Sequence, residues 1–392
     1  MRQRSFSRTR LTAACCSGYF VLGLVVSLIG ASLEKFAVQV SATVPQVGGT
    51  FFFFIGSASF LTLFAAGPLM DRYGKKPVLI AGSLFSGTAM LLACLVATPA
   101  WAWAVMFMLG AGVGCFNAGI NTLINDLYPD NPGWVLNLVN AVFGLGAVFL
   151  PLVAGWLFLY LDLVHLLVLT AFCSFVPGVL FAVSVLPPAT EGERFKLGEA
   201  ATVLRDPLVV LVGLVLFFYV GLEASFGIWG RSAIVDHWGM QTPFDQFTLA
   251  GYWASLVLGR VIAGTVFRSI PDEELVLYCS AGSCAGIAVF ILAPSALAAS
   301  AGFWFTGLCF GPVFPSSLGT TGTCFKQYTG TIFALVIASG VLGAVVMTPA
   351  IGAVAGVSSL MTALWLTLAA GVLLLLSQLL VRKKVKERLK LN

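Results

Sequence analysis

Twelve long apolar segments follow one another along the chain, and they constrain its fold more than any other feature. Each segment holds about 20 or more mainly apolar residues, enough for an α-helix to cross the hydrocarbon core of a bilayer. Only 9% of the 392 residues are charged and 59% are hydrophobic, whereas soluble domains carry about 25% charge. We therefore predict an all-α membrane protein with twelve transmembrane helices. The predicted spans are 11–36, 48–70, 77–97, 100–124, 134–158, 162–186, 208–234, 246–268, 274–295, 297–321, 329–355 and 358–381.

The basic residues support this number of spans, because the cytoplasmic loops of membrane proteins are enriched in Lys and Arg. If the N-terminus is cytoplasmic, all of the 21 basic residues except Lys35, Arg231 and Arg260 fall in inner loops or tails. The topology thus predicts that both termini are cytoplasmic, with the basic tail 382–392 beside anionic lipid. The net charge of +5 follows from this topology, so no nucleic-acid partner is expected.

A polar stretch at 187–206 divides the chain into two halves. We predict an N-terminal six-helix bundle at 1–186, a cytoplasmic linker at 187–206, and a C-terminal six-helix bundle with a basic tail at 207–392. The halves are similar: LGAVFLPLVAG at 145–155 is repeated as LGAVVMTPAIG at 342–352. Internal repeats of this kind are typical of transporters whose substrate site lies near the middle of the bilayer.

The loop between the predicted second and third spans reads GPLMDRYGKKPVL, at 67–79. It matches every defined position of the pattern Gly-x-x-x-Asp-Arg-x-Gly-Arg/Lys-Arg/Lys, and the chain therefore resembles the major facilitator superfamily. The resemblance implies two six-helix bundles that rock about a central cavity, and a cytoplasmic latch in this loop. The latch residues are Gly67, Asp71, Arg72, Gly74, Lys75 and Lys76.

Elementary physical chemistry suggests a role for several of these residues. Gly67 would let a neighbouring helix approach closely, and Gly74 would allow a tight turn. Asp71 would receive the positive N-terminal end of another helix, which we expect to be the eleventh. The alternative is a basic loop that only fixes topology.

Three further segments are similar to the fucose–glucose–galactose branch of that superfamily, to which fucose permease belongs. They are YVGLEASFGIWGRS at 219–232, GYWASLVLGRVIAG at 251–264 and GLCFGPVFPSSLG at 307–319. The resemblance implies a sugar-sized substrate. Fucose permease has a carboxylate in its fourth span where this chain has Asn117, so its proton coupling is not carried over. Other members have Glu or Gln at the position of Glu223, and some use sodium.

Glu223 is the one acid well inside a predicted span, where a charge costs about 2.5–3.5 kcal/mol on insertion scales. We expect it to bind substrate and to carry the coupling, with Asn117 or Asn121 as its partner. Arg231, two helical turns further on, is expected with Glu34 at the outer mouth of the cavity. Arg260 either extends to the inner membrane surface or pairs with an acid such as Asp126.

The predicted substrate-binding residues are amides, aromatic rings and Glu223. Asn117 and Asn121 share one helix face at i, i+4 spacing, and amides suit hydroxyl-rich ligands because they both donate and accept hydrogen bonds. The alternative is that these amides hydrogen-bond other helices. The full set is Asn117, Asn121, Asn140, Glu223, Trp229 and Trp253.

We therefore expect a monomeric secondary transporter in the cytoplasmic (plasma or inner) membrane, and not an enzyme. Its substrate is expected to be a monosaccharide or a similar small polar solute, moved by alternating access with a proton or sodium ion. No other cofactor and no metal site are expected, because the histidines and cysteines lack metal-ligand spacing. A drug or metabolite exporter working as a proton antiporter and an uncoupled uniporter are the alternatives.

Overall fold

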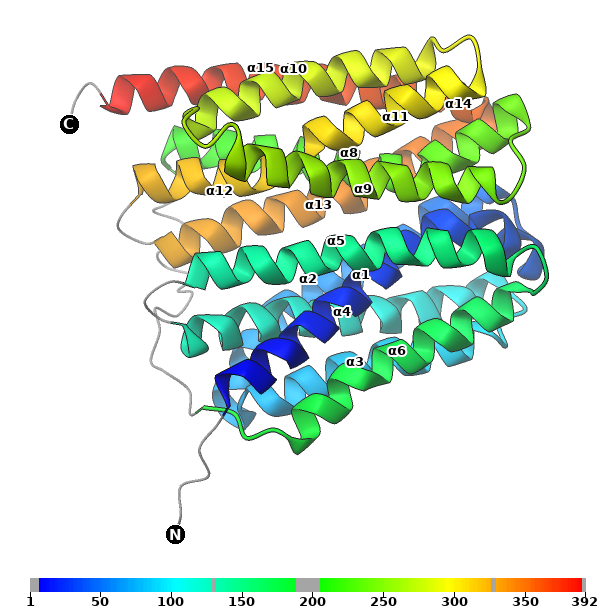
Figure 1. Cartoon of the computed structure of the whole chain (residues 1–392), viewed down its shortest axis with the longest axis horizontal. Helices are drawn as coiled ribbons and strands as arrows, with labels where there is room; N and C mark the ends of the chain where they lie inside the picture. Colours follow the sequence, from blue (N-terminus) through cyan, green and yellow to red (C-terminus); the bar gives the residue numbers. More distant parts are fainter. Residues whose placement is uncertain (1–6, 129–131, 188–204, 326–328, 390–392) are drawn as a thin grey trace. The chain divides into compact units, whose positions relative to one another are not determined.

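The structure is a computed structural model that describes residues 7–128, 132–187, 205–325 and 329–389 (Figure 1). The predicted linker 187–206 lies almost wholly outside the described residues, so its role stays a prediction. Within the described ranges the regular structure is helical. The first half contains α1 (Arg8–Gln39), α2 (Val44–Tyr73), α3 (Lys75–Ala93), α4 (Pro99–Leu127), α5 (Pro132–Leu157) and α6 (Leu163–Val183). The second contains α8 (Pro207–Trp238), α9 (Phe244–Thr265), α10 (Asp272–Ile291), α11 (Ala296–Phe310), α12 (Val313–Cys324), α13 (Thr329–Val357), α14 (Leu360–Ala363) and α15 (Trp365–Leu389).

The prediction of twelve membrane-spanning helices is confirmed for the described residues. Two spans are divided into shorter helices. The tenth consists of α11 and α12, separated at Gly311 and Pro312, and the twelfth consists of α14 and α15. Which side of the membrane holds the termini stays a prediction.

Polar residues begin several of these helices, as helix-capping chemistry requires. The Thr43 side chain accepts from the backbone N–H of Gln46, whose own side chain accepts from the Thr43 N–H. At the start of α8, Asp206 Oδ1 accepts from the backbone N–H of Leu208 at 2.9 Å. Such caps satisfy N–H groups that have no partner within the helix.

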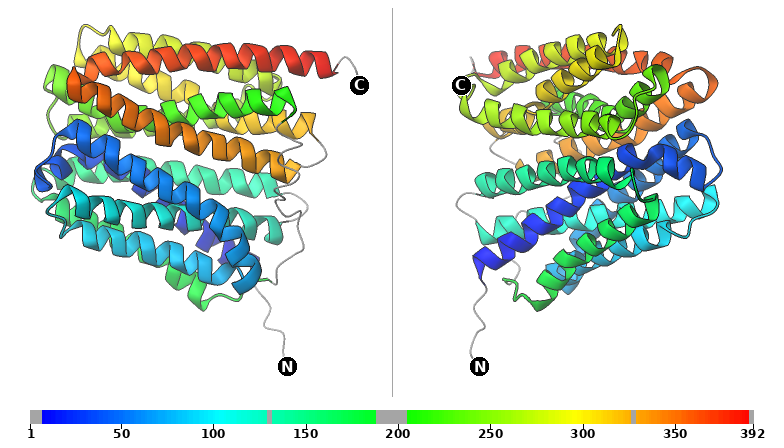
Figure 2. Two further views of the ribbon diagram at one scale, coloured as in Figure 1. Left: turned by 180° about the vertical axis from the view of Figure 1, so that it is seen from behind. Right: turned by 45° about the vertical axis from the view of Figure 1, so that its right-hand side comes forward.

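The chain clusters into two compact units, which are described separately (Figure 2). Unit 1 comprises Met1–Thr190 and Thr242–Ala250, and unit 2 comprises Glu191–Gln241 and Gly251–Asn392. In unit 1, α1 packs against α5, α2 against α4, and α3 against both α4 and α6. In unit 2, α8 packs against α13, and α10 against α11 and α15. The pairs α1–α5, α3–α4 and α3–α6 of unit 1 thus have counterparts in α8–α13, α10–α11 and α10–α15 of unit 2.

The repeated LGAV segments mark a close helix approach in each unit. A Cβ atom added at Gly146 would lie 2.2 Å from the backbone oxygen of Phe20, where α5 meets α1. At Gly343 it would lie 1.9 Å from the backbone oxygen of Phe217, where α13 meets α8. Only glycine allows contacts this close, which are typical of small-residue packing in membranes.

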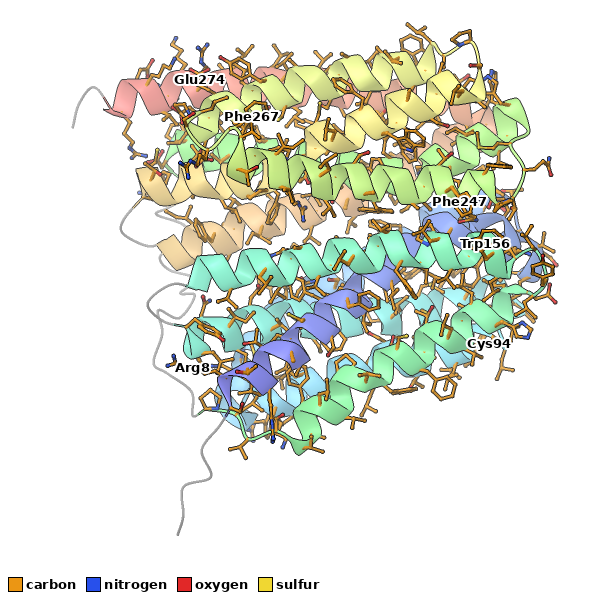
Figure 3. All side chains as sticks on the ribbon, in the orientation of Figure 1. Arg8, Cys94, Trp156, Phe247, Phe267 and Glu274 are labelled. Atoms are coloured by element: carbon orange, nitrogen blue, oxygen red, sulfur yellow. The ribbon has the colours of Figure 1, made fainter. Side chains whose placement is uncertain are left out.

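Charged side chains join the end of α15 to other helices of unit 2. Glu274 Oε1, on α10, accepts from Arg382 Nε and Lys386 Nζ, each at 2.7 Å (Figure 3). Arg388 donates to Asp206 at the same distance. Several basic residues of the tail therefore form ion pairs within unit 2.

Candidate functional site

Glu223 belongs to a cluster of polar side chains in unit 2. Its side chain is partly exposed and interacts with the Tyr219 hydroxyl and the Arg260 guanidinium. Tyr219 precedes it by one turn of α8, and Arg260 comes from α9. The Tyr219 hydroxyl interacts with both charged groups, yet it is buried and no described atom forms a hydrogen bond of good geometry with it. We call Glu223, Tyr219, Tyr252 and Arg260 the Glu223 cluster.

The Glu223 cluster lies against aromatic side chains. The Tyr252 hydroxyl donates to the backbone oxygen of Glu223 at 3.0 Å, and its ring stacks on that of Phe303, with centroids 4.4 Å apart. The Tyr219 ring meets Phe310 edge-on at 5.7 Å. Tyr219 and Tyr252 are both fully buried. Electrostatic interactions on this side of the cluster are therefore strengthened by the low local dielectric constant.

The division between α11 and α12 positions Arg260. In a continuous helix the Gly311 carbonyl would accept from the N–H of residue 315, but Pro315 has none. Arg260 Nε donates to this oxygen at 3.2 Å. Asp126, the acid suggested as a partner of Arg260, forms an ion pair with Lys75 inside unit 1, and its pairing with Arg260 stays a prediction.

The predicted aromatic ligands Trp229 and Trp253 are buried in unit 2, with 0% and 1% of their surface exposed. Trp229 Nε1 donates to the Thr348 backbone oxygen at 3.1 Å, and Ser225 forms a hydroxyl contact with the Thr348 side chain, also at 3.1 Å. Trp229 therefore joins α8 to α13 in this structure. A role of either ring in substrate binding stays a prediction.

The predicted amides form a partly exposed polar face in unit 1. Asn121 Oδ1 accepts from the Tyr19 hydroxyl at 3.1 Å, and its Nδ2 donates to the Asn117 backbone oxygen at 2.8 Å. Asn117 Nδ2 donates to the Val113 backbone oxygen at 3.2 Å. Asn140 on α5 is also partly exposed. Much of the amide capacity of α4 is thus used within unit 1, and a role in binding stays a prediction.

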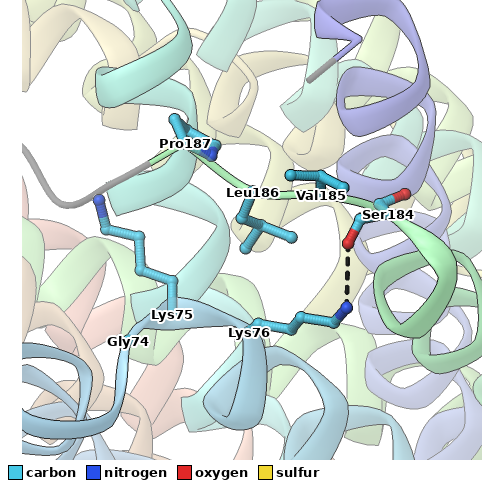
Figure 4. Close-up of a pocket in the computed structure, with 7 residues that line it drawn as sticks. All are labelled: Gly74, Lys75, Lys76, Ser184, Val185, Leu186 and Pro187. Atoms are coloured by element: carbon cyan, nitrogen blue, oxygen red, sulfur yellow. Dashed lines mark hydrogen bonds between the residues drawn. The ribbon is translucent and has the colours of Figure 1, made fainter. Parts of the chain in front are cut away.

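The signature loop forms the turn between α2 and α3 (Figure 4). Gly74 has a φ of 81°, in a region that favours glycine. Lys75 pairs with Asp126 at the end of α4, and both side chains are nearly buried. Lys76 Nζ donates to the backbone oxygens of Ala182 and Ser184 at 2.6 and 3.0 Å. This contact places a cation at the carbonyl end of α6, where the helix dipole favours it.

A cavity of about 400 Å³ lies beside this turn, lined by Gly74, Lys75, Lys76, Ser184, Val185, Leu186 and Pro187. Arg72 is exposed and lies over the Tyr73 ring at 5.1 Å. The Asp71 side chain lies outside the described residues, so its contact with another helix stays a prediction. The expected close approach at Gly67 is wrong for the described residues, because a Cβ there would meet no atom within 4 Å.

The two residues expected at the outer mouth differ in burial. Glu34 is partly exposed, whereas Arg231 has only 3% of its surface exposed. Two polar residues that were not predicted as site residues, Asp245 and Gln246, are buried at the start of α9. Gln246 Nε2 donates to the Ala31 backbone oxygen at 2.7 Å, within unit 1. Their only sequence signal was their polarity beside the start of an apolar segment.

Comparisons with known sequences identify the family. The family model described as Major Facilitator Superfamily matches residues 15–347. Sodium-dependent glucose transporter 1A of Mus musculus is 23% identical, over 87% of this chain and 88% of its own length. The uncharacterized MFS-type transporter YfkL of Bacillus subtilis (strain 168) is 30% identical, and the chain spans only 35% of its length. Multidrug resistance protein MdtG of Escherichia coli (strain K12 / DH10B) is 28% identical, with 49% of its length spanned.

Solved transporter structures share the fold. A mutant of the nucleoside transporter NupG has a TM-score of 0.78 at 11% identity, covering 95% of this chain and 99% of that chain. FucP, in the outward conformation, has a TM-score of 0.66 at 17% identity, covering 94% and 98%. Identities this low show the fold alone, and the family model carries the assignment. With its twelve spans and its signature loop, the chain belongs to the major facilitator superfamily of transporters.

Proposed function

We propose that the protein is a secondary transporter that moves a small polar solute, of the monosaccharide class, by alternating access. The observation that carries this proposal is Glu223, a partly exposed carboxylate inside a membrane-spanning helix. Ionisable residues in such positions are costly and are retained where they bind ions or substrates. The glucose transporter relative supports a sugar, and the D-xylose–proton symporter, with a TM-score of 0.76 at 12% identity, shares the fold.

The proposed substrate contacts combine amides and a carboxylate. Asn117, Asn121 and Asn140 supply donors and acceptors in unit 1, and Glu223 supplies acceptors in unit 2. A sugar hydroxyl can satisfy both kinds of group. Coupling to a cation would use Glu223, because its partly exposed carboxylate lies inside a membrane-spanning helix. The signature loop would act as the latch on the cytoplasmic side, where we also propose that both termini lie.

Uptake into proteoliposomes tests the proposal. Purified protein is reconstituted and given radiolabelled monosaccharides, with an imposed proton gradient or sodium gradient in separate arms. We expect one gradient to drive accumulation of at least one sugar, and Glu223→Gln to abolish the accumulation. Glu387→Gln is the control, because Glu387 is exposed at the end of α15 and pairs with Lys384.

The alternatives give different results in the same vesicles. A uniporter would equilibrate a sugar without accumulating it, and Glu223→Gln would leave its gradient response unchanged. An exporter, the alternative that the relative MdtG suggests, would instead extrude apolar dyes in exchange for protons. Either result would contradict the proposal of a cation-coupled sugar transporter.

A further inference from the structure

Two hydrogen bonds between side chains join α1 and α4 in unit 1. The Tyr19 hydroxyl donates to Asn121 Oδ1 at 3.1 Å. The Thr12 hydroxyl contacts the hydroxyl of Tyr128, which directly follows the last residue of α4, at 2.9 Å. The two contacts are about two helical turns apart on both helices. They therefore belong to one interface between α1 and α4, but only the first of them reaches a predicted substrate-binding residue.

A backbone atom determines which way the Asn121 amide is turned. Asn121 Nδ2 lies 2.8 Å from the Asn117 backbone oxygen, and a carbonyl oxygen can only accept a hydrogen bond. The amide nitrogen is therefore on that side, and Oδ1 faces Tyr19. Because a phenol hydroxyl can donate as well as accept, Tyr19 is the donor in this pair. The two ends of the amide are thus held in one orientation, by Tyr19 and by the backbone of α4.

The same reasoning determines the orientation of Asn117, one turn earlier on α4. Its Nδ2 donates to the Val113 backbone oxygen at 3.2 Å, so its Oδ1 points away from that carbonyl. Each amide has two N–H donors and a carbonyl oxygen with two lone pairs. Among the described residues, one N–H of Asn121 and the Oδ1 of Asn117 are not used by other side chains or by the backbone. Both side chains are partly exposed, so these groups are available to a ligand.

Packing holds Tyr19 in place behind the amide. Only 4% of its surface is exposed. At the neighbouring Gly18, an added Cβ would lie 2.6 Å from Cδ1 of Ile120, so α1 and α4 are tightly packed at this level. A buried hydroxyl costs free energy unless it forms a hydrogen bond, and Asn121 Oδ1 is its acceptor here. Tyr19 therefore has both the position and the energetic reason to fix the Asn121 amide.

We propose that Tyr19 is a positioning residue of the sugar site, since it fixes the Asn121 amide without touching the substrate itself. In this orientation the exposed face of α4 offers an N–H donor at Asn121 and a carbonyl acceptor at Asn117. The sugar would use one hydroxyl to accept from Asn121 and another to donate to Asn117. The inference rests on the proposed transport of a sugar and specifies how unit 1 would recognise it.

Sugar binding to the purified full-length protein in detergent tests the role of Tyr19. A panel of aldohexoses and aldopentoses, including D-glucose and D-xylose, is screened for thermal stabilisation, and titration calorimetry gives the Kd of the tightest ligand. We expect Tyr19→Phe to raise this Kd about three- to tenfold. In an Asn121→Ala background the same change should have no further effect, because Tyr19 acts only through that amide. Equal effects in both backgrounds would overturn the proposal.

Tyr128→Phe is the matched control for this measurement. It removes the other hydrogen bond of the same interface, the one with Thr12, and leaves the contact between Tyr19 and Asn121 in place. Both Phe variants should lower the melting temperature of the free protein, but only Tyr19→Phe should weaken sugar binding. If Tyr128→Phe weakens binding as much, the effect belongs to the packing of the two helices, and the proposal is wrong.

Analogues of the tightest ligand test which hydroxyl each amide recognises. Each hydroxyl is replaced in turn by hydrogen, and by fluorine, which cannot donate a hydrogen bond. We expect one hydroxyl whose removal no longer matters in Asn121→Ala, and another whose removal no longer matters in Asn117→Ala. Fluorine should replace the first better than the second. Tyr19→Phe should reduce the loss of affinity at the first hydroxyl alone, and a reduction at neither or at both would contradict the proposal.

Failure of the proposed function would look different from failure of this inference. If no sugar in the panel stabilises the wild-type protein, the assignment of a sugar substrate fails, and this inference fails with it. If sugars bind and Tyr19→Phe binds them as tightly as the wild type does, only the role of Tyr19 is overturned.

Discussion

The two units pack their central helices in the same way but distribute their charges differently. In unit 1, Gly146 of α5 meets the backbone of α1, and in unit 2 Gly343 of α13 meets the backbone of α8. Both glycines occupy the same place in the repeated LGAV segment. Close packing in these helix pairs thus has one physical basis, the absence of a side chain where two backbones touch.

Charge placement separates the units. Unit 1 has a nearly buried ion pair, Lys75 with Asp126, where α3 begins and α4 ends. Unit 2 has a carboxylate and a guanidinium within its helices, at Glu223 and Arg260. One scaffold can therefore provide a fixed ionic contact in one unit and, as we propose, a carboxylate that changes charge in the other.

The largest expected effect is on the ion pair of unit 1. Asp126→Ala would remove the carboxylate that pairs with Lys75 in a nearly buried position, and breaking a buried ion pair costs about 3–5 kcal/mol of unfolding free energy. Thermal unfolding and folded yield in detergent measure the loss. The double variant Asp126→Ala with Lys75→Met should recover most of it. No recovery would mean that the pair is not what stabilises this part of unit 1.

The repeated glycines should be nearly as sensitive. Gly146→Ala and Gly343→Ala each place a methyl group against a backbone oxygen that cannot move aside easily, an overpacking cost of about 1–3 kcal/mol or more. Gly264→Ala is the control, because a Cβ there meets no atom within 4 Å. If one variant is tolerated and the other is not, the two helix pairs are not equivalent.

A smaller effect is expected at the end of unit 2. Glu274→Ala removes the shared partner of Arg382 and Lys386, whose side chains are 37% and 49% exposed. Exposed ion pairs contribute little, so the melting temperature should fall less than in Asp126→Ala. Glu387→Ala should leave it unchanged. An equal loss in Glu274→Ala and Asp126→Ala would show that burial does not distinguish these charge contacts.

The smallest stability effect is expected at Tyr219. Tyr219→Phe removes a buried hydroxyl that has no hydrogen bond of good geometry among the described residues. The free energy of unfolding should therefore be unchanged or slightly larger. Tyr19→Phe in unit 1 is the comparison, since it loses a hydrogen bond to Asn121 and should destabilise by about 1 kcal/mol. Melting curves of the two variants measure this difference, and the opposite order would contradict it.

Much of the fold could be predicted from the sequence, because the thickness of the bilayer fixes the length of each span. The signature at 67–79 indicated the family because its residues lie close together in the sequence, at fixed spacing. The division of the tenth span was harder to predict, because apolar composition continues across Gly311 and Pro312. The expectation for Gly67 failed because close approach depends on a neighbouring helix, which the sequence of one helix does not show.

The candidate site was only partly predictable. Sequence placed Glu223 inside a span, but it did not join Glu223 to Arg260 or Arg260 to the carbonyl of Gly311. Nor did it show that Trp229 of α8 donates to the Thr348 backbone oxygen of α13, or that Asp126 is paired with Lys75. These contacts link residues from different helices, whose rotations about their axes are set by packing.

The sequence by itself determined the twelve spans, the signature loop and the repeated LGAV segments, since each depends on residues close together in the chain. Only the tertiary structure decided which charges and carbonyls meet. Hydrocarbon drives apolar segments into helices whatever their neighbours are, because backbone groups must be satisfied within each helix. Side-chain partners arise between helices, where glycines such as Gly146 and Gly343 let backbones touch and so fix which faces meet.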